Sequence, residues 1–82
     1  MIDKNYKLTN NNYVNFHLTE DGIDYTIYNS DGIEIDGGIL ETNKTVEKEI
    51  LKELSNFANI DFNNKVEINE DEFDELINKI QI

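Results

Sequence analysis

Two Asp-Gly pairs, ten residues apart, constrain the fold of the first half of the chain most strongly. Asp21-Gly22 and Asp31-Gly32 separate three stretches in which apolar and polar residues alternate. These stretches are residues 13–19, 23–28 and 33–40. Alternation is typical of a half-buried strand, and Asp-Gly tolerates the positive φ of a tight hairpin. The pattern therefore predicts a three-stranded antiparallel meander.

The alternation also assigns the two faces of this sheet. Apolar side chains such as Val14, Phe16 and Ile27 take one face and form the expected core. Polar and aromatic side chains take the other face, where three carboxylates are expected. They are Asp24, Glu34 and Asp36. Gly37-Gly38 interrupts the third stretch and predicts a bulge or bend there.

The second half of the chain predicts two helices. Residues 46–58 carry apolar side chains at helical spacing, after three candidate N-caps, Thr42, Asn43 and Thr45. Residues 66–80 predict the second helix, with Asn69 and Glu72 as a capping box. Its apolar stripe comprises Phe73, Leu76, Ile77 and Ile80. The expected architecture is therefore α+β, with both helices covering one face of the three-stranded sheet.

The length of 82 residues predicts a single domain, 1–82, with a small core. The chain has no cysteine, and its first residues contain no apolar run, so we expect no disulfide and no signal peptide. No later run is long enough to span a bilayer, and a monomer in the bacterial cytoplasm is expected. Residues 1–12 fit either a short helix or an extended lead-in.

The net charge of −11 is unevenly distributed. Residues 20–41 hold seven acidic residues and no lysine, and residues 61–82 hold seven acidic residues and two lysines. Residues 42–60 are balanced, with three lysines and three glutamates. Because the first helix stays neutral, the negative charge forms two blocks rather than a uniform solvating surface.

Catalytic and metal-binding patterns are absent from the sequence. The single histidine, His17, lies on a strand, and the serines Ser30 and Ser55 are the available hydroxyl partners for a catalytic base. The segment 61–65 starts like a calcium loop but lacks its glycine. Direct nucleic-acid binding would need an excess of Lys and Arg, and this chain has 7 of them against 18 Asp and Glu. We therefore expect no enzyme, no cofactor, no metal and no direct contact with nucleic acid.

The acidic blocks indicate instead a surface for a basic partner. Carboxylates in rows can occupy a channel that normally receives DNA phosphates. The proposed contacts lie on the last helix and on the sheet. They are Asp71, Asp74, Glu75, Glu72, Glu70, Asp24, Glu34 and Asp36. Glu72 is the least secure of these because it also belongs to the capping box.

The acidic run N-E-D-E-F-D-E-L at 69–76, after three short strands and a helix, resembles the small DNA-mimicking anti-CRISPR proteins of phages and mobile elements. Members of that group block the RNA-guided nuclease of type II systems at the site that reads the DNA motif flanking a target. The resemblance implies an inhibitor that binds a CRISPR effector nuclease.

A second stretch, D-Y-T-I-Y-N-S-D-G-I-E-I-D-G-G at 24–38, is similar to a module found in polyvalent proteins of phages and conjugative elements. This resemblance also implies a mobile-element origin. Two other functions remain open. An immunity or antitoxin-like protein would bind one cognate toxin, and a regulatory module would use a surface of Tyr13, Tyr25 and Tyr28.

Overall fold

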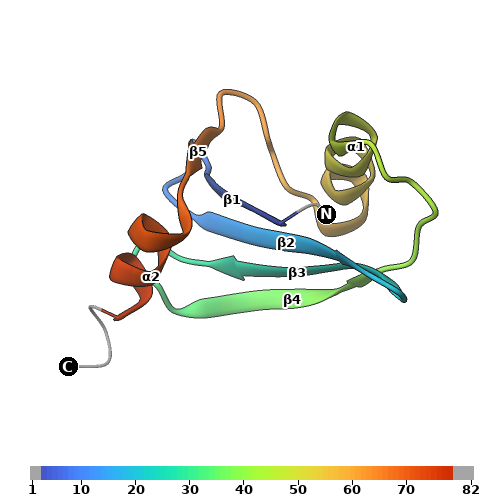
Figure 1. Cartoon of the computed structure of the whole chain (residues 1–82). Helices are drawn as coiled ribbons and strands as arrows, with labels where there is room; N and C mark the ends of the chain where they lie inside the picture. Colours follow the sequence, from blue (N-terminus) through green and yellow to red (C-terminus); the bar gives the residue numbers. More distant parts are fainter. Residues whose placement is uncertain (1–2, 79–82) are drawn as a thin grey trace.

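The computed structural model describes residues 3–78 and contains one five-stranded antiparallel sheet and two helices (Figure 1). The strands are β1 (Asp3–Lys7), β2 (Tyr13–Thr19), β3 (Gly22–Tyr28), β4 (Glu34–Leu40) and β5 (Val66–Ile68). The helices are α1 (Glu47–Ala58) and α2 (Glu70–Asn78). The sheet order is β4-β3-β2-β1-β5. The α+β class is confirmed, but the predicted three-stranded sheet is wrong, because β1 and β5 extend it.

Strand β1 could not be predicted from alternation, because its sequence, D-K-N-Y-K, has one large apolar residue, Tyr6. It pairs with β2 on one side and with β5 on the other. Polar contacts add to this pairing. The Lys4 ammonium lies 3.3 Å from the Glu67 carboxylate, and the Asn15 amide donates to the Asn5 side chain at 2.7 Å. Residues 1–12, left open by the sequence, thus supply a strand, and β2 is central rather than an edge.

The meander of β2, β3 and β4 is confirmed: the first hairpin turns at Glu20-Asp21, and β3 begins directly afterwards at Gly22, where φ is +132°. The predicted irregularity at Gly37-Gly38 is wrong. The register between β3 and β4 shifts instead between Ile27 and Tyr28, which face Asp36 and Glu34 and leave one residue of β4 over. Gly38 stays in register, and a Cβ there would lie 3.3 Å from the Tyr25 hydroxyl, so close packing explains this glycine.

The main core lies between the sheet and α1. Ile50 and Leu54 of α1 are fully buried, as are Val14, Phe16 and Ile23 of the sheet. The helix begins after Val46, which makes no side-chain cap hydrogen bond, so the predicted caps at 42, 43 and 45 are wrong. It ends at an Asn59 in the left-handed region, whose N–H donates to the Ser55 carbonyl. Burial of apolar side chains rather than capping therefore holds α1.

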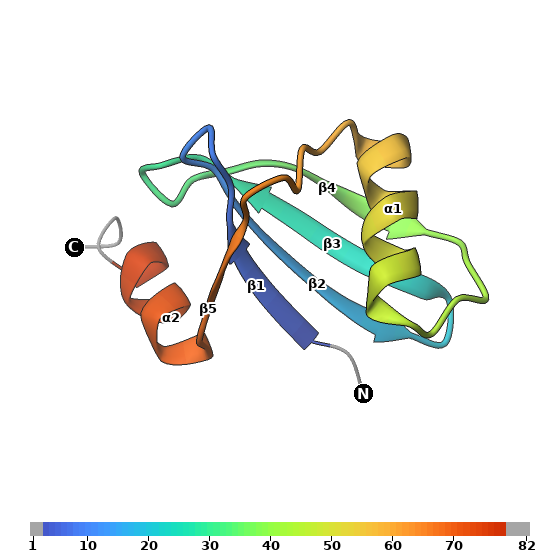
Figure 2. The same cartoon turned by 90° about the horizontal axis from the view of Figure 1, so that it is seen from above.

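The helix α2 lies on the opposite face of the sheet, so the prediction that both helices cover one face is wrong. Tyr25 of β3 contacts Phe57 of α1, whereas Tyr28, three residues along the same strand, contacts Phe73 of α2. Side chains three apart on a strand point to opposite faces. Figures 1 and 2 show the two helices well apart. The predicted helix at 66–80 begins only at Glu70, and Ile80 lies outside the described residues.

Candidate protein-binding surface

The acidic helix α2 begins at a side-chain cap. The Asn69 side-chain oxygen accepts a hydrogen bond from the Glu72 backbone N–H at 2.8 Å. The Asn69 amide in turn donates to the Glu72 carboxylate at 3.0 Å. The predicted cap is therefore confirmed, although Glu72 reaches the side chain of Asn69 rather than its backbone. The Glu72 carboxylate is engaged locally, which makes it a weaker candidate for partner contact.

The other carboxylates of α2 face solvent. Glu70, Asp71, Asp74 and Glu75 are all exposed, while Phe73 between them is buried against the sheet. The ion pairs found among residues 3–78 are Lys4–Glu67 and, when the histidine is protonated, His17–Asp24 at 3.8 Å. None of them involves α2. Its carboxylates are thus left to solvent or a partner as far as the described residues go.

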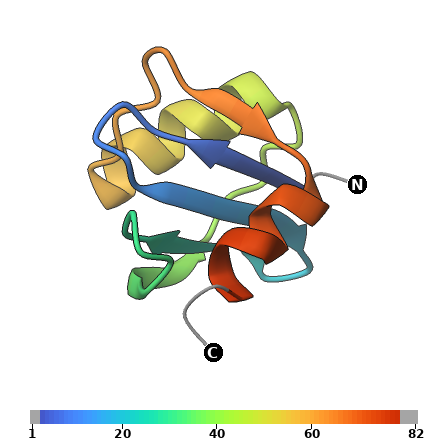
Figure 3. The same cartoon turned by 90° about the vertical axis from the view of Figure 1, so that its left-hand side faces the viewer.

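A groove of about 480 Å³ separates the start of α2 from the sheet. Its acidic lining residues come from three elements and are Asp3, Glu67, Glu70 and Asp74. One lysine, Lys4, and one histidine, His17, share the lining. Asn5 and Asn15, which are hydrogen bonded to each other, also line it. Figure 3 looks at α2 from this end of the molecule, with the sheet and α1 behind it. The groove joins the helix and the sheet into one acidic surface.

The sheet carboxylates of the sequence prediction do not share one face. Asp24 pairs in register with His17, and Glu34 pairs with Tyr28, which places both on the α2 side. Asp36 pairs with Ile27 and lies on the α1 side. The prediction of a common surface for all three is therefore wrong for Asp36. The extra residue of β4 at the register shift causes the change of face.

The pKa values of Tyr25 and Tyr28 agree with the placement of Asp36 and Glu34 on opposite faces of the sheet. Burial, and then the Glu34 charge, raises the pKa of Tyr28 on the α2 side. Burial, and then the Asp36 charge, raises the pKa of Tyr25 on the α1 side. Each carboxylate thus acts on the tyrosine of its own face. The acidic surface next to α2 keeps Asp24 and Glu34 and loses Asp36.

The sequence pattern did not single out Asp3 and His17 as members of this surface. The available signal for His17 was its place on the polar side of β2, opposite Asp24. Asp3 reaches His17 only because β1 is a strand, which the sequence left open. The groove lining, within residues 3–78, contains no serine, threonine or cysteine that a histidine base would activate.

The alternative surface of Tyr13, Tyr25 and Tyr28 is not exposed. Tyr13 and Tyr25 are buried, and Tyr28 is half-buried against Phe73 at a ring-centroid distance of 5.3 Å. The Tyr25 and Tyr28 rings contact Phe57 of α1 and Phe73 of α2. A regulatory partner would therefore have to use other residues.

The acids of residues 3–78 do not gather into a group of three or more that could hold a metal ion. Within the same residues, neither helix is long and apolar enough to cross a membrane. These residues form an exposed acidic helix beside an acidic groove.

Comparison with known proteins gives one family. The family model described as large polyvalent protein-associated domain 16 matches residues 3–79. No curated protein and no solved structure gives a significant match. The match spans every described strand and helix, and it agrees with the resemblance seen at 24–38. The chain belongs to the large polyvalent protein-associated domain 16 family.

Proposed function

We propose that this domain is a non-enzymatic binding module that presents the acidic surface beside α2 to a basic, nucleic-acid-binding partner. It competes with nucleic acid for the partner's site. The observation that carries this proposal is the set of exposed α2 carboxylates, which pair with no cation within residues 3–78. Charges without internal partners are available to an external one at little desolvation cost.

The spacing of the charge supports mimicry of DNA. Five carboxylates lie between Glu70 and Glu75 on a helix that rises about 1.5 Å per residue. They therefore present roughly one negative charge per 1.8 Å of axis. Duplex DNA presents roughly one per 1.7 Å. Asp24 and Glu34 extend the same sign of charge onto the adjoining sheet face.

The most specific form of the proposal takes a CRISPR effector nuclease of the host cytoplasm as the partner. Such nucleases read a short flanking DNA motif through basic side chains and hold nucleic acid in a positively charged channel. The resemblance of 69–76 to DNA-mimicking anti-CRISPR proteins supports this target. Membership of a polyvalent protein-associated family is consistent with a phage or mobile-element origin.

The test compares two triple variants with equal charge change. One neutralises α2 by D71N/D74N/E75Q. The control, E20Q/D21N/E41Q, neutralises three exposed carboxylates near the β2–β3 hairpin, at the far end of the sheet from α2 in Figure 1. DNA binding by a purified type II effector is measured with each variant as inhibitor, at low and high salt.

We expect the α2 variant to inhibit roughly 3- to 150-fold less well, since exposed charge pairs contribute about 0.2–1 kcal/mol each. The control should inhibit as the unmodified chain does, and higher salt should weaken inhibition. Equal loss in both variants would reduce the effect to net charge, and full inhibition by the α2 variant would refute the proposed surface.

An immunity or antitoxin-like function is the second candidate, because the same uncompensated carboxylates suit a basic toxin. In that case the effector should be unaffected. A toxin encoded beside this chain should instead bind it, with the same sensitivity to the α2 variant. Purified toxin and domain, mixed and separated by size, give the measurement.

A further inference from the structure

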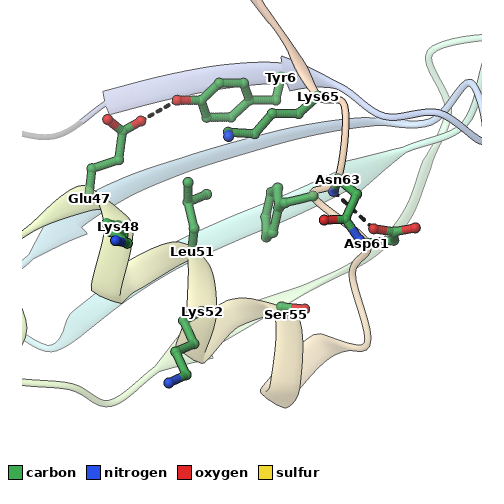
Figure 4. A pocket seen from close by; sticks show the side chains of 10 residues that line it. Tyr6, Glu47, Lys48, Leu51, Lys52, Ser55, Asp61, Asn63 and Lys65 are labelled. Atoms are coloured by element: carbon green, nitrogen blue, oxygen red, sulfur yellow. Dashed lines mark hydrogen bonds between the residues drawn. The ribbon is translucent and has the colours of Figure 1, made fainter.

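A second cavity, of about 490 Å³, lies on the α1 side of the molecule, between α1 and the connection to β5 (Figure 4). Three of the chain's seven lysines line it, Lys48, Lys52 and Lys65, together with Glu47 and Asp61. Its lining therefore carries net positive charge in a protein whose total charge is −11. The cavity is within the size range of small-molecule sites.

The two carboxylates of this cavity are engaged within the protein. The Tyr6 hydroxyl donates a hydrogen bond to Glu47, and the Asn63 backbone N–H donates to Asp61 at 2.9 Å. The lysines form none of the ion pairs found among residues 3–78. In a chain with 18 acidic residues, the lysines are thus the groups of this cavity that lack an opposite charge.

Lys65 is the lysine that enters the cavity. Its ammonium lies 5.4 Å from the centroid of the Tyr6 ring, and Figure 4 shows it beneath that ring. Lys52 points away from the centre in the same view and adds positive potential at the rim. The backbone at Lys65 is fixed by a turn in which its N–H donates to the Phe62 carbonyl at 3.2 Å.

The remaining wall is apolar and rigid. Phe62 packs edge-on against Tyr6, with ring centroids 6.4 Å apart, and against Phe16 of the core at 6.5 Å. Leu51 points into the cavity from α1 (Figure 4). A flat apolar body would therefore contact rings and a leucine whose positions the core already sets, so little ordering would oppose its binding.

We infer that this cavity binds a small organic anion, with its carboxylate or phosphate at Lys65 and an apolar, ring-bearing part against Phe62 and Leu51. The site is separate from the acidic surface beside α2 and does not depend on it. An anion supplies the charge that the lysines lack, and the apolar wall distinguishes it from inorganic phosphate. Burial and the hydrogen bond to Glu47 raise the pKa of Tyr6, so its hydroxyl remains a neutral neighbour.

The test is a titration of the isotopically labelled chain, followed by amide chemical shifts. The probes are phenyl phosphate, phenylacetate, inorganic phosphate and neutral benzyl alcohol. We expect phenyl phosphate or phenylacetate to produce saturable shifts at Leu51, Asn63 and Lys65, and not at α2. Inorganic phosphate and benzyl alcohol should bind several-fold more weakly. Whichever of the two aromatic anions binds more tightly shows whether the natural ligand carries a phosphate or a carboxylate.

Lysine-to-glutamine variants show which positive charge binds the anion. Lys65→Gln should weaken binding of the preferred anion about fivefold or more, as expected for the loss of one charge pair in a hydrated site. Lys44→Gln, an exposed lysine outside the cavity, removes the same charge and should change binding less than twofold. The double change K48Q/K52Q should give an intermediate loss, and it tests the lysine set if Lys65→Gln proves unstable.

Three results would overturn the inference. The first is no saturable shift at the cavity with either aromatic anion. The second is unchanged affinity in folded Lys65→Gln and K48Q/K52Q. The third is equal affinity for benzyl alcohol, which would show that the lysines play no part.

Discussion

The helix α2 should detach from the sheet without unfolding the rest of the domain when Phe73 is changed to alanine. Phe73 is 7% exposed and is the buried side chain among residues 70–76 of α2. It lies outside the main core cluster, which is on the other face of the sheet. Loss of Phe73 therefore removes the anchor of α2 and leaves the contacts of α1 untouched.

The expected magnitude follows from the burial of this ring. Replacing a buried phenylalanine by alanine costs about 3–5 kcal/mol. We expect about 3 kcal/mol here, because the contact is with Tyr28 and the sheet surface rather than with a closed core. That cost corresponds to a roughly 100-fold rise in the population with α2 detached.

Amide hydrogen exchange measures this directly. The backbone N–H of residue 73 donates to the Asn69 carbonyl at 3.0 Å. In Phe73→Ala this N–H should lose its protection against exchange, whereas the amides of β2 and β3 should keep theirs. Leu54→Ala is the matched control, since Leu54 is fully buried in the main core and its loss should lower protection throughout. Parallel loss of protection in all elements of Phe73→Ala would refute the reasoning, because α2 would then belong to the same cooperative unit.

Three further predictions concern stability. Asn69→Ala should lower the unfolding free energy by about 1 kcal/mol in urea denaturation, because it removes the side-chain acceptor for the Glu72 N–H. Gly22→Ala should cost about 2–4 kcal/mol in the same assay, because φ is +132° and the new Cβ would lie 2.2 Å from the Leu40 carbonyl oxygen. Burial, and then the hydrogen bond to Glu47, raises the pKa of Tyr6 above its ordinary 10.0, so the folded chain holds this proton more tightly. Stability should therefore fall above pH 10 by up to about 1.4 kcal/mol per pH unit, and Tyr6→Phe should remove that part of the slope in denaturation series from pH 9 to 11.

The strands with clear alternation could be predicted from the sequence, and those without it could not. Residues 13–19 and 23–28 alternate because one face of each strand enters the core. Strand β1 carries Lys4 and Asn5 at positions where a core strand would carry apolar residues, and it is held by pairing on both sides. Pairing with the neighbouring β2 and with the distant β5, rather than its own residue pattern, makes it a strand.

The face of each carboxylate depended on register, which local sequence does not set. Asp24 lies on the predicted side because β2 and β3 pair regularly, whereas Glu34 lies there because it follows the register shift between β3 and β4. Asp36 pairs regularly with Ile27 and shares its α1 face, and the single extra residue between Asp36 and Glu34 puts these two carboxylates on opposite faces. The cap at Asn69 was predictable because all its atoms lie within four residues.

The position of α2 follows from the three-residue strand β5. Ile68 pairs with Asn5, and after one linking residue, Asn69, the helix begins at Glu70. A single linking residue leaves the chain no length to cross the sheet edge and reach the α1 face, so α2 folds back over the face to which Ile68 and Asn5 point. Glu70 and Asp74 of α2 therefore line the same groove as Asp3, away from Lys48 and Lys52 on α1. The separation of an acidic surface from a lysine-lined cavity is thus a consequence of strand pairing, and each can be altered by substitution without changing the other.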